Sequence, residues 1–186
     1  MASAGRMERV LIVAATEREL VSVEPARALV CGIGPVEAAA ATARTLEEER
    51  PSGVLHVGIA GAHGVAPLTL VLGSEAVYCD AAGPLVPARA LPDPELLDRL
   101  RGAFPEAELR PIGTSARVGG SHGVEVEAME GFAVLRACEL AAVPAVEVRV
   151  VANAIGEPDR ALWRFDEAFA TLAETLPRLV AVASGA

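Results

Sequence analysis

The chain contains no lysine, so all 16 of its basic residues are arginine, against 25 acidic residues and a formal net charge of −9. Proteins that bind nucleic-acid backbones gather lysine and arginine against the phosphates. The acidic balance therefore disfavours a nucleic-acid partner. Alanine, glycine and proline are abundant, and with the missing lysine they indicate a GC-rich codon bias rather than a function.

Aromatic residues are also scarce, at 3% of the chain, although 52% of it is hydrophobic. A core with so few rings must be built from closely packed small aliphatic side chains. The length of 186 residues suits a single domain with a full core. We predict a disordered lead over residues 1–6 and one domain over residues 7–186.

No apolar stretch reaches the roughly 18 residues of a membrane-spanning helix, and the start of the chain lacks a signal-peptide pattern. The soft metal ligands are few: Cys31, Cys79, Cys138, His56, His63 and His122. Their spacing shows neither a CxxC motif nor a metal-ligand pattern. We therefore expect a reduced, cytoplasmic protein with no membrane partner, no metal and no cofactor.

Four near-continuous apolar runs are typical of strands buried on both faces of a sheet: residues 10–14, 28–31, 54–59 and 145–152. Helical apolar spacing lies between and after them, most clearly in the stripe from Phe165 to Leu179. Strands that alternate with helices predict an α/β fold. We expect a single-domain three-layer α/β/α sandwich with a mixed, largely parallel central sheet.

Two polar residues lie where predicted strands end. Glu130 stands at a junction between a strand and a helix, and Asn153 follows the run at residues 144–152. The carboxyl ends of parallel strands share one rim of a sheet, where open α/β folds bind small molecules. A carboxylate can bind sugar hydroxyls, and an amide can read the edge of a base. Together they predict a nucleoside ligand.

Five segments, in this order, resemble the purine nucleoside phosphorylase and nucleosidase superfamily: residues 13–20, 31–39, 58–61, 126–131 and 149–153. Within it, residues 153–163 are similar to the futalosine hydrolases, which remove hypoxanthine from futalosine in menaquinone synthesis. The resemblance extends over most of the chain. It implies a nucleoside phosphorylase-like fold, a small-molecule nucleoside substrate, and a homodimer or larger homo-oligomer.

The resemblance also implies roles for individual residues. Glu19 matches the carboxylate that activates the attacking water in hydrolytic members, with Glu17 as its competitor. Glu130 matches the carboxylate that holds the ribose hydroxyls, and Met129 packs against the sugar. Asn153 stands where adenine-specific nucleosidases have aspartate, and its amide can donate to N7 or O6 of a 6-oxopurine. The phosphorylase Gly-Asp-Pro turn is missing, which favours hydrolysis.

Four further residues are candidates for contact with the ligand. Gly61 permits close approach of the backbone, while Ile59 replaces a hydroxyl residue common in the family. His122 lies near the base-pocket segment, and Trp163 either covers the base or anchors the last helix. Residues 20–28 and 121–127 are short for the family.

These observations predict hydrolysis of futalosine to dehypoxanthine futalosine and hypoxanthine. The alternatives are a purine nucleoside phosphorylase, a methylthioadenosine/S-adenosylhomocysteine nucleosidase, and a nucleoside-binding protein without catalysis.

Overall fold

The computed structural model describes residues 9–24, 27–81 and 83–185, and the predicted lead over residues 1–6 lies outside them. The strands are β1 (Val10–Ala14), β2 (Ala28–Val30), β3 (Gly53–Ala62), β4 (Leu70–Tyr78), β5 (Arg89–Ala90), β6 (Glu108–Thr114), β7 (Val126–Ala128) and β8 (Ala145–Ala154). The α-helices are α1 (Pro35–Glu49), α2 (Pro94–Ala103), α3 (Gly131–Leu140) and α4 (Phe165–Ala183). Two short 3₁₀ helices, η1 (Glu17–Leu20) and η3 (Arg160–Leu162), flank the candidate site.

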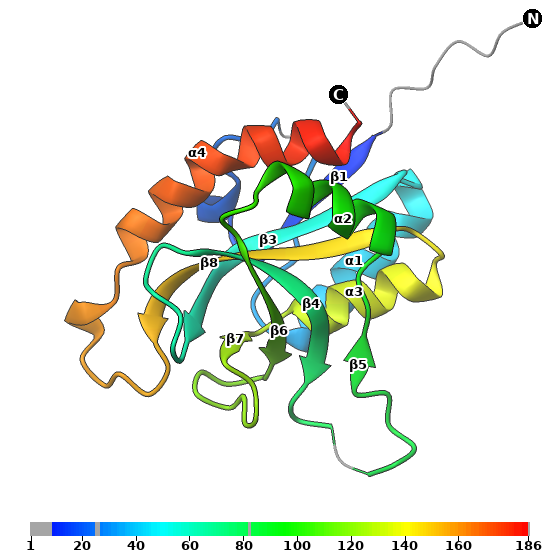
Figure 1. Cartoon of the computed structure of the whole chain (residues 1–186). Helices are drawn as coiled ribbons and strands as arrows, with labels where there is room; N and C mark the ends of the chain where they lie inside the picture. Colours follow the sequence, from blue (N-terminus) through cyan, green and yellow to red (C-terminus); the bar gives the residue numbers. More distant parts are fainter. Residues whose placement is uncertain (1–8, 25–26, 82, 186) are drawn as a thin grey trace, which may run out of the picture.

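The predicted α/β fold with a mixed, largely parallel sheet is confirmed. The strand order is β2-β1-β3-β7-β6-β4-β5, and β8 pairs with both β3 and β4. The pairing therefore closes into a ring of β3, β7, β6, β4 and β8, from which β1 and β2 extend as an open parallel wing (Figure 1). Small aliphatic side chains such as Val71, Ile112 and Val126 form a separate core cluster among these strands.

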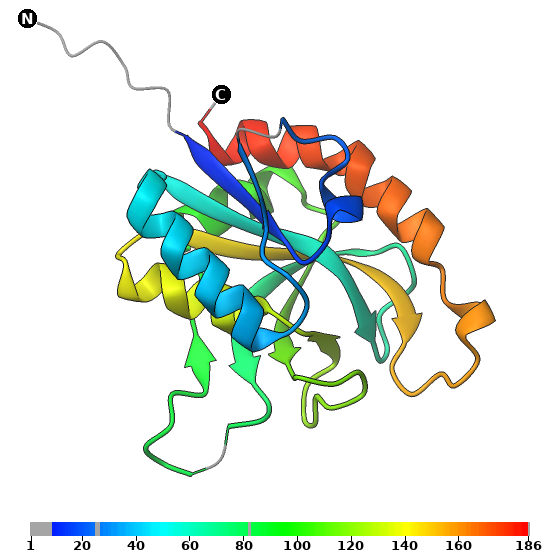
Figure 2. The same ribbon diagram turned by 180° about the vertical axis from the view of Figure 1, so that it is seen from behind.

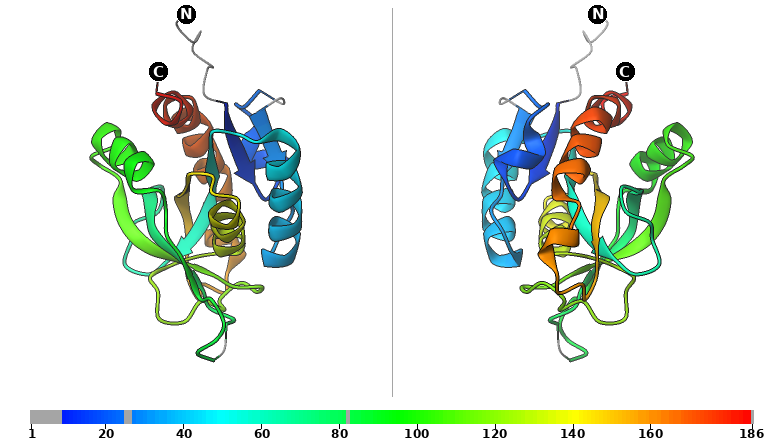
Figure 3. Two further views of the ribbon diagram at one scale, coloured as in Figure 1. Left: turned by 90° about the vertical axis from the view of Figure 1, so that its right-hand side faces the viewer. Right: turned by 90° about the vertical axis from the view of Figure 1, so that its left-hand side faces the viewer.

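Helices cover the sheet on two sides. On one side α4 and α2 pack together over β1, β3 and β8. On the other side α1 lies beside α3, which packs against β4, β6 and β8 (Figures 2 and 3). The apolar stripe predicted for the last helix is the face that α4 buries, with Leu172, Leu176 and Leu179 at most 1% exposed. Within the described ranges, no helix is long and apolar enough to span a membrane.

Local sequence explains where the helices begin. α1 starts at Pro35, whose missing N–H is not needed in a first turn, directly after Gly34 with a φ of 95°. α2 starts at Pro94, and the Asp93 side chain caps it by accepting a hydrogen bond from the Leu96 N–H at 2.8 Å.

The structure corrects one argument drawn from the sequence. β7 runs antiparallel to β3, with Glu127 opposite Gly61, so its carboxyl end does not share a rim with the end of β3. β7 instead runs back along β3, from Ala62 to Gly61, and the residues that follow it reach the cavity at Met129 and Glu130. Asn153 lies inside β8, one residue before its end, rather than after it.

Candidate functional site

A cavity of about 310 Å³ lies at the carboxyl ends of β1, β3 and β8. Seven of the residues predicted from the sequence line it: Glu19, Ile59, Gly61, Met129, Glu130, Asn153 and Trp163. The eighth, His122, has an exposed side chain and is not among the residues that line this cavity. The cavity thus gathers residues from distant parts of the sequence, from Ala15 to Phe169.

Glu19 is fixed at the cavity wall by the turn that follows β1. Its Oε2 accepts hydrogen bonds from the backbone N–H and the hydroxyl of Thr16, each at 2.9 Å, which caps η1. Its Oε1 accepts from the Ile59 N–H on β3 at 3.3 Å. The competing carboxylate, Glu17, is exposed and absent from the lining. Of these two carboxylates, Glu19 is therefore the one that is buried, oriented and part of the cavity wall.

Glu130 is the N-cap residue of α3 and is 4% exposed. Its Oε1 accepts a hydrogen bond from the Gly34 N–H at 2.9 Å, so the glycine turn before α1 holds it in place. Burial raises the pKa of Glu130, while the nearby Arg149 and the Gly34 N–H act in the opposite direction. The carboxylate is thus held by donors that favour its charged form in a poorly hydrated site.

Arg149 on β8 joins the two carboxylates, and the sequence analysis gave it no role. It is 1% exposed, and its Nη2 lies 3.7 Å from Glu130 Oε2. A methyl group added at Gly58 would collide with Arg149 Nη1 and would lie 2.5 Å from Glu19 Oε1. The guanidinium therefore lies between Glu19 and Glu130. An arginine inside an apolar strand that is buried on both faces is the signal that could have identified it.

Two further buried groups lie behind Arg149. Glu147 is fully buried, and its Oε1 accepts from Arg149 Nε at 2.9 Å. The pKa of Glu147 is raised, and burial is the largest cause. The positive charge of Arg149 acts in the opposite direction. His56 contacts Arg149 through Nε2 and Val13 O through Nδ1 at 3.1 Å. Burial and the adjacent guanidinium hold the pKa of His56 well below its ordinary 6.5, so the ring is neutral and Nε2 accepts.

The far end of the cavity carries an amide and an aromatic wall. Asn153 is 9% exposed, and its Nδ2 donates to Ala154 O at 3.1 Å. Trp163 donates from Nε1 to Glu157 O at 3.1 Å and meets Phe165 edge-to-face, with ring centroids 5.2 Å apart. Trp163 therefore both lines the cavity and packs against the start of α4.

Among residues 9–24, 27–81 and 83–185, no group of three or more His, Cys, Asp or Glu side chains could hold a metal ion. The polar groups converge as Glu19, Glu130 and Arg149 at one end of the cavity, and as Asn153 and Glu127 at the other. This arrangement suits a ligand with a hydroxylated part and a flat, hydrogen-bonding part.

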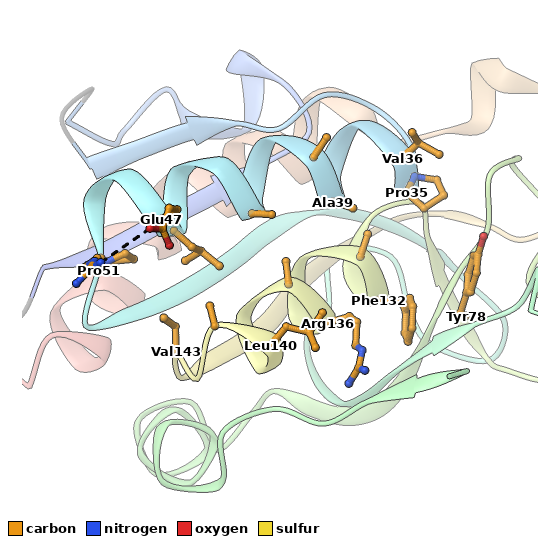
Figure 4. Close-up of a pocket in the computed structure, with 17 residues that line it drawn as sticks. Pro35, Val36, Ala39, Glu47, Pro51, Tyr78, Phe132, Arg136, Leu140 and Val143 are labelled. Carbon is orange, nitrogen blue, oxygen red and sulfur yellow. Dashed lines mark ion pairs between the residues drawn. The ribbon is translucent and has the colours of Figure 1, made fainter. Parts of the chain in front are cut away.

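A second, larger hollow of about 1040 Å³ runs between α1 and α3 (Figure 4). It is lined mainly by small and aliphatic side chains, including Val36, Ala39 and Leu140. None of Glu19, Glu130 and Asn153 reaches it. Although this groove is larger, the smaller cavity holds the oriented polar groups and is the better candidate for chemistry.

The chain is similar to known proteins in both sequence and fold. A family model described as the phosphorylase superfamily matches residues 14–120. A futalosine hydrolase from Streptomyces coelicolor is 31% identical, covering 83% of this chain and 78% of that protein. One from Thermus thermophilus is 32% identical, covering 83% and 81%.

Solved structures support the fold. A futalosine hydrolase mutant of Helicobacter pylori superposes with a TM-score of 0.82 at 15% identity, covering 92% of this chain and 97% of that chain. A methylthioadenosine/S-adenosylhomocysteine nucleosidase from Colwellia psychrerythraea, in complex with adenine, gives 0.81 at 21% identity, covering 97% and 96%.

Proposed function

Because this chain belongs to the phosphorylase superfamily and, within it, to the futalosine hydrolases, we propose that it hydrolyses the N-glycosidic bond of a 6-oxopurine nucleoside. The substrate is futalosine, and the products are dehypoxanthine futalosine and hypoxanthine, a step of menaquinone biosynthesis. The observation that carries the proposal is the convergence of Glu19 and Glu130 on one guanidinium in the cavity that also contains Asn153.

In this mechanism Glu19 accepts a proton from the attacking water. The oxygen of that water forms a bond to C1′ of the ribose as the bond from C1′ to N9 breaks. The sugar passes through an oxocarbenium-like state, which nearby negative charge stabilises. Three hydrogen bonds from Thr16 and Ile59 hold the Glu19 carboxylate in one orientation, so the base is positioned before the substrate arrives.

Glu130 holds the sugar by accepting hydrogen bonds from its hydroxyls, and Met129 supplies an apolar surface beside it. Arg149 lies between the two carboxylates, and its positive charge opposes the rise that burial causes in the pKa of Glu130. The departing purine takes the electron pair of the broken bond and gains one proton to become hypoxanthine, which balances the proton that Glu19 takes from water. Asn153 stabilises that base by donating to N7 or O6, which makes it a better leaving group.

The two catalytic alternatives differ in their nucleophile or in their base. A phosphorylase needs donors for phosphate beside the sugar, yet the side chain at residue 59 is isoleucine rather than a hydroxyl residue. A nucleosidase for methylthioadenosine needs an acid that can protonate N7 of adenine, and Asn153 cannot supply a proton in that way.

Chromatographic detection of the released base tests the proposal directly. Purified protein with futalosine should release hypoxanthine in buffer without phosphate, faster than it releases adenine from methylthioadenosine. Turnover that requires phosphate and yields ribose 1-phosphate would identify a phosphorylase. Binding of futalosine with no release at high protein concentration would identify a nucleoside-binding protein, and either result would overturn the proposal.

The protein is proposed to act in the cytoplasm as a homodimer. All three cysteines are free thiols, two of them buried, which suits a reducing compartment. The groove between α1 and α3 is the surface we assign to the second copy. It is apolar, it exposes Val36 at 78% and Leu140 at 72%, and its end at Pro35 is two residues from Ile33, which lines the cavity.

A further inference from the structure

A third buried carboxylate, which the mechanism above does not use, also lines the cavity. Glu127 is the middle residue of β7 and is 6% exposed. Glu127 is not among the site residues predicted from the sequence. A buried carboxylate is destabilising unless its oxygens are hydrogen-bonded, so its partners indicate what it does.

The register of the strands places Glu127 beside Asn153. Gly61 on β3 pairs with Glu127 on one side and with Asn153 on the other. A methyl group at Gly61 would lie 3.1 Å from Asn153 Nδ2 and 3.5 Å from Glu127 Cγ. Because Gly61 has no side chain, the amide and the carboxylate come together over it. A flat base that enters this end of the cavity meets both groups along one edge.

Both side chains keep hydrogen-bonding capacity for a ligand. Glu127 Oε1 accepts from the Gly119 N–H at 2.8 Å, and its Oε2 accepts from the Ser121 N–H at 3.3 Å. A carboxylate offers about four acceptor sites, so each oxygen can accept another donor. Asn153 uses one N–H for Ala154 O and keeps the second. The pair therefore presents an acceptor next to a donor.

A 6-oxopurine carries the complementary pattern, with a donor at N1–H next to an acceptor at O6. We infer that Glu127 is a specificity-determining residue that accepts a hydrogen bond from N1–H of the base, while Asn153 donates to O6 or N7. This inference rests on the proposed function and names the atom of the base that the same site selects. Adenine has a lone pair at N1, which would face the acceptor oxygens of Glu127, so N1 would lose its hydrogen bond to water and gain none from the protein.

Binding of free bases to the wild-type protein tests the inference without any catalysis. Calorimetry should show hypoxanthine binding at least about tenfold more tightly than adenine and than 1-methylhypoxanthine, which lacks the N1 proton. Equal binding of the three bases would overturn the inference. A failure of the proposed function is seen separately, as absence of hypoxanthine release from futalosine.

The variant Glu127→Gln should lower the ratio of hypoxanthine to adenine affinity by about tenfold or more, because an amide can either accept from N1–H or donate to N1. The matched control is Glu125→Gln. Glu125 precedes β7, is exposed and pairs with Arg110 at 3.2 Å, so the ratio should not change. If Glu127→Gln weakens both bases by the same factor, Glu127 only holds the loop at Gly119–Ser121, and the inference is wrong. If that variant does not fold, the wild-type comparison decides.

Discussion

Glu17 and Glu19 are two positions apart, yet only Glu19 faces the cavity. The variant Glu19→Gln keeps the shape of the side chain but removes the group that takes the proton from water. We expect it to lower kcat for hypoxanthine release by about 10² to 10⁴. Affinity for hypoxanthine, measured by calorimetry, should stay close to that of the wild type.

Glu17→Gln is the matched control and should leave kcat unchanged, because Glu17 lies on the exposed side of η1. The reverse pattern, with a slow Glu17→Gln variant and a normal Glu19→Gln variant, would show that the wrong carboxylate has been chosen. An equal loss in both variants would indicate that the turn itself, rather than one carboxylate, matters.

Some residues of the site were predictable from the sequence and others were not, for a physical reason. Glu19, Glu130 and Asn153 stand near strand ends, where polar residues interrupt an apolar run and are easy to see. Glu147 and Arg149 alternate with valines inside a strand, a pattern that is also typical of a strand with one face in solvent. In the folded protein this face is buried, Arg149 pairs with Glu147, and Arg149 also lies beside Glu130. The sequence alone does not show these pairings.

At the scale of the element, β8 determines the electrostatics of the site. It carries Glu147 and Arg149 on the face toward α3. Arg149 contacts the carboxylates of both Glu147 and Glu130.

Burial raises the pKa of Glu130 above its ordinary 4.5. Substrate binding needs charged Glu130, so kcat/KM should fall as the pH drops through that raised pKa. The acid limb of the pH profile should therefore lie above 4.5.

The variant Glu147→Gln removes a negative charge and a competitor for Arg149. Both changes favour the charged form of Glu130, so the acid limb of kcat/KM should move to lower pH. The control Glu139→Gln changes an exposed carboxylate on α3 that pairs with Arg136, and should leave the limb in place. A limb that moves to higher pH, or not at all, would contradict this coupling.

Elements with strong patterns were predictable and short ones were not. The buried strands at residues 10–14 and 54–59 and the amphipathic α4 follow directly from their apolar spacing. β7 has only three residues, and its direction depends on pairing with both β3 and β6. No local pattern encodes that choice, so the antiparallel arrangement and the position of Glu127 were missed.

At the scale of the whole molecule, the groove between α1 and α3 predicts self-association. The chain has a mass of 19.1 kDa, and sedimentation or light scattering should give about twice that value. Ala40→Arg places a charge in the groove and should shift the protein toward the monomer. Ala170→Arg, on the exposed face of α4, is the control and should remain dimeric. A monomeric wild type would contradict the assignment.

The alternation along β8 has a consequence for folding. Val146, Val148 and Val150 face the core shared with α4, while Glu147 and Arg149 face the opposite side. A slip of β8 by one residue against β3 would exchange these two sets and bury unpaired charge where the valines belong. The error that would misplace the reactive groups is thus the same error that would prevent the sheet from closing. A chain that has folded has, for that reason, already assembled its site.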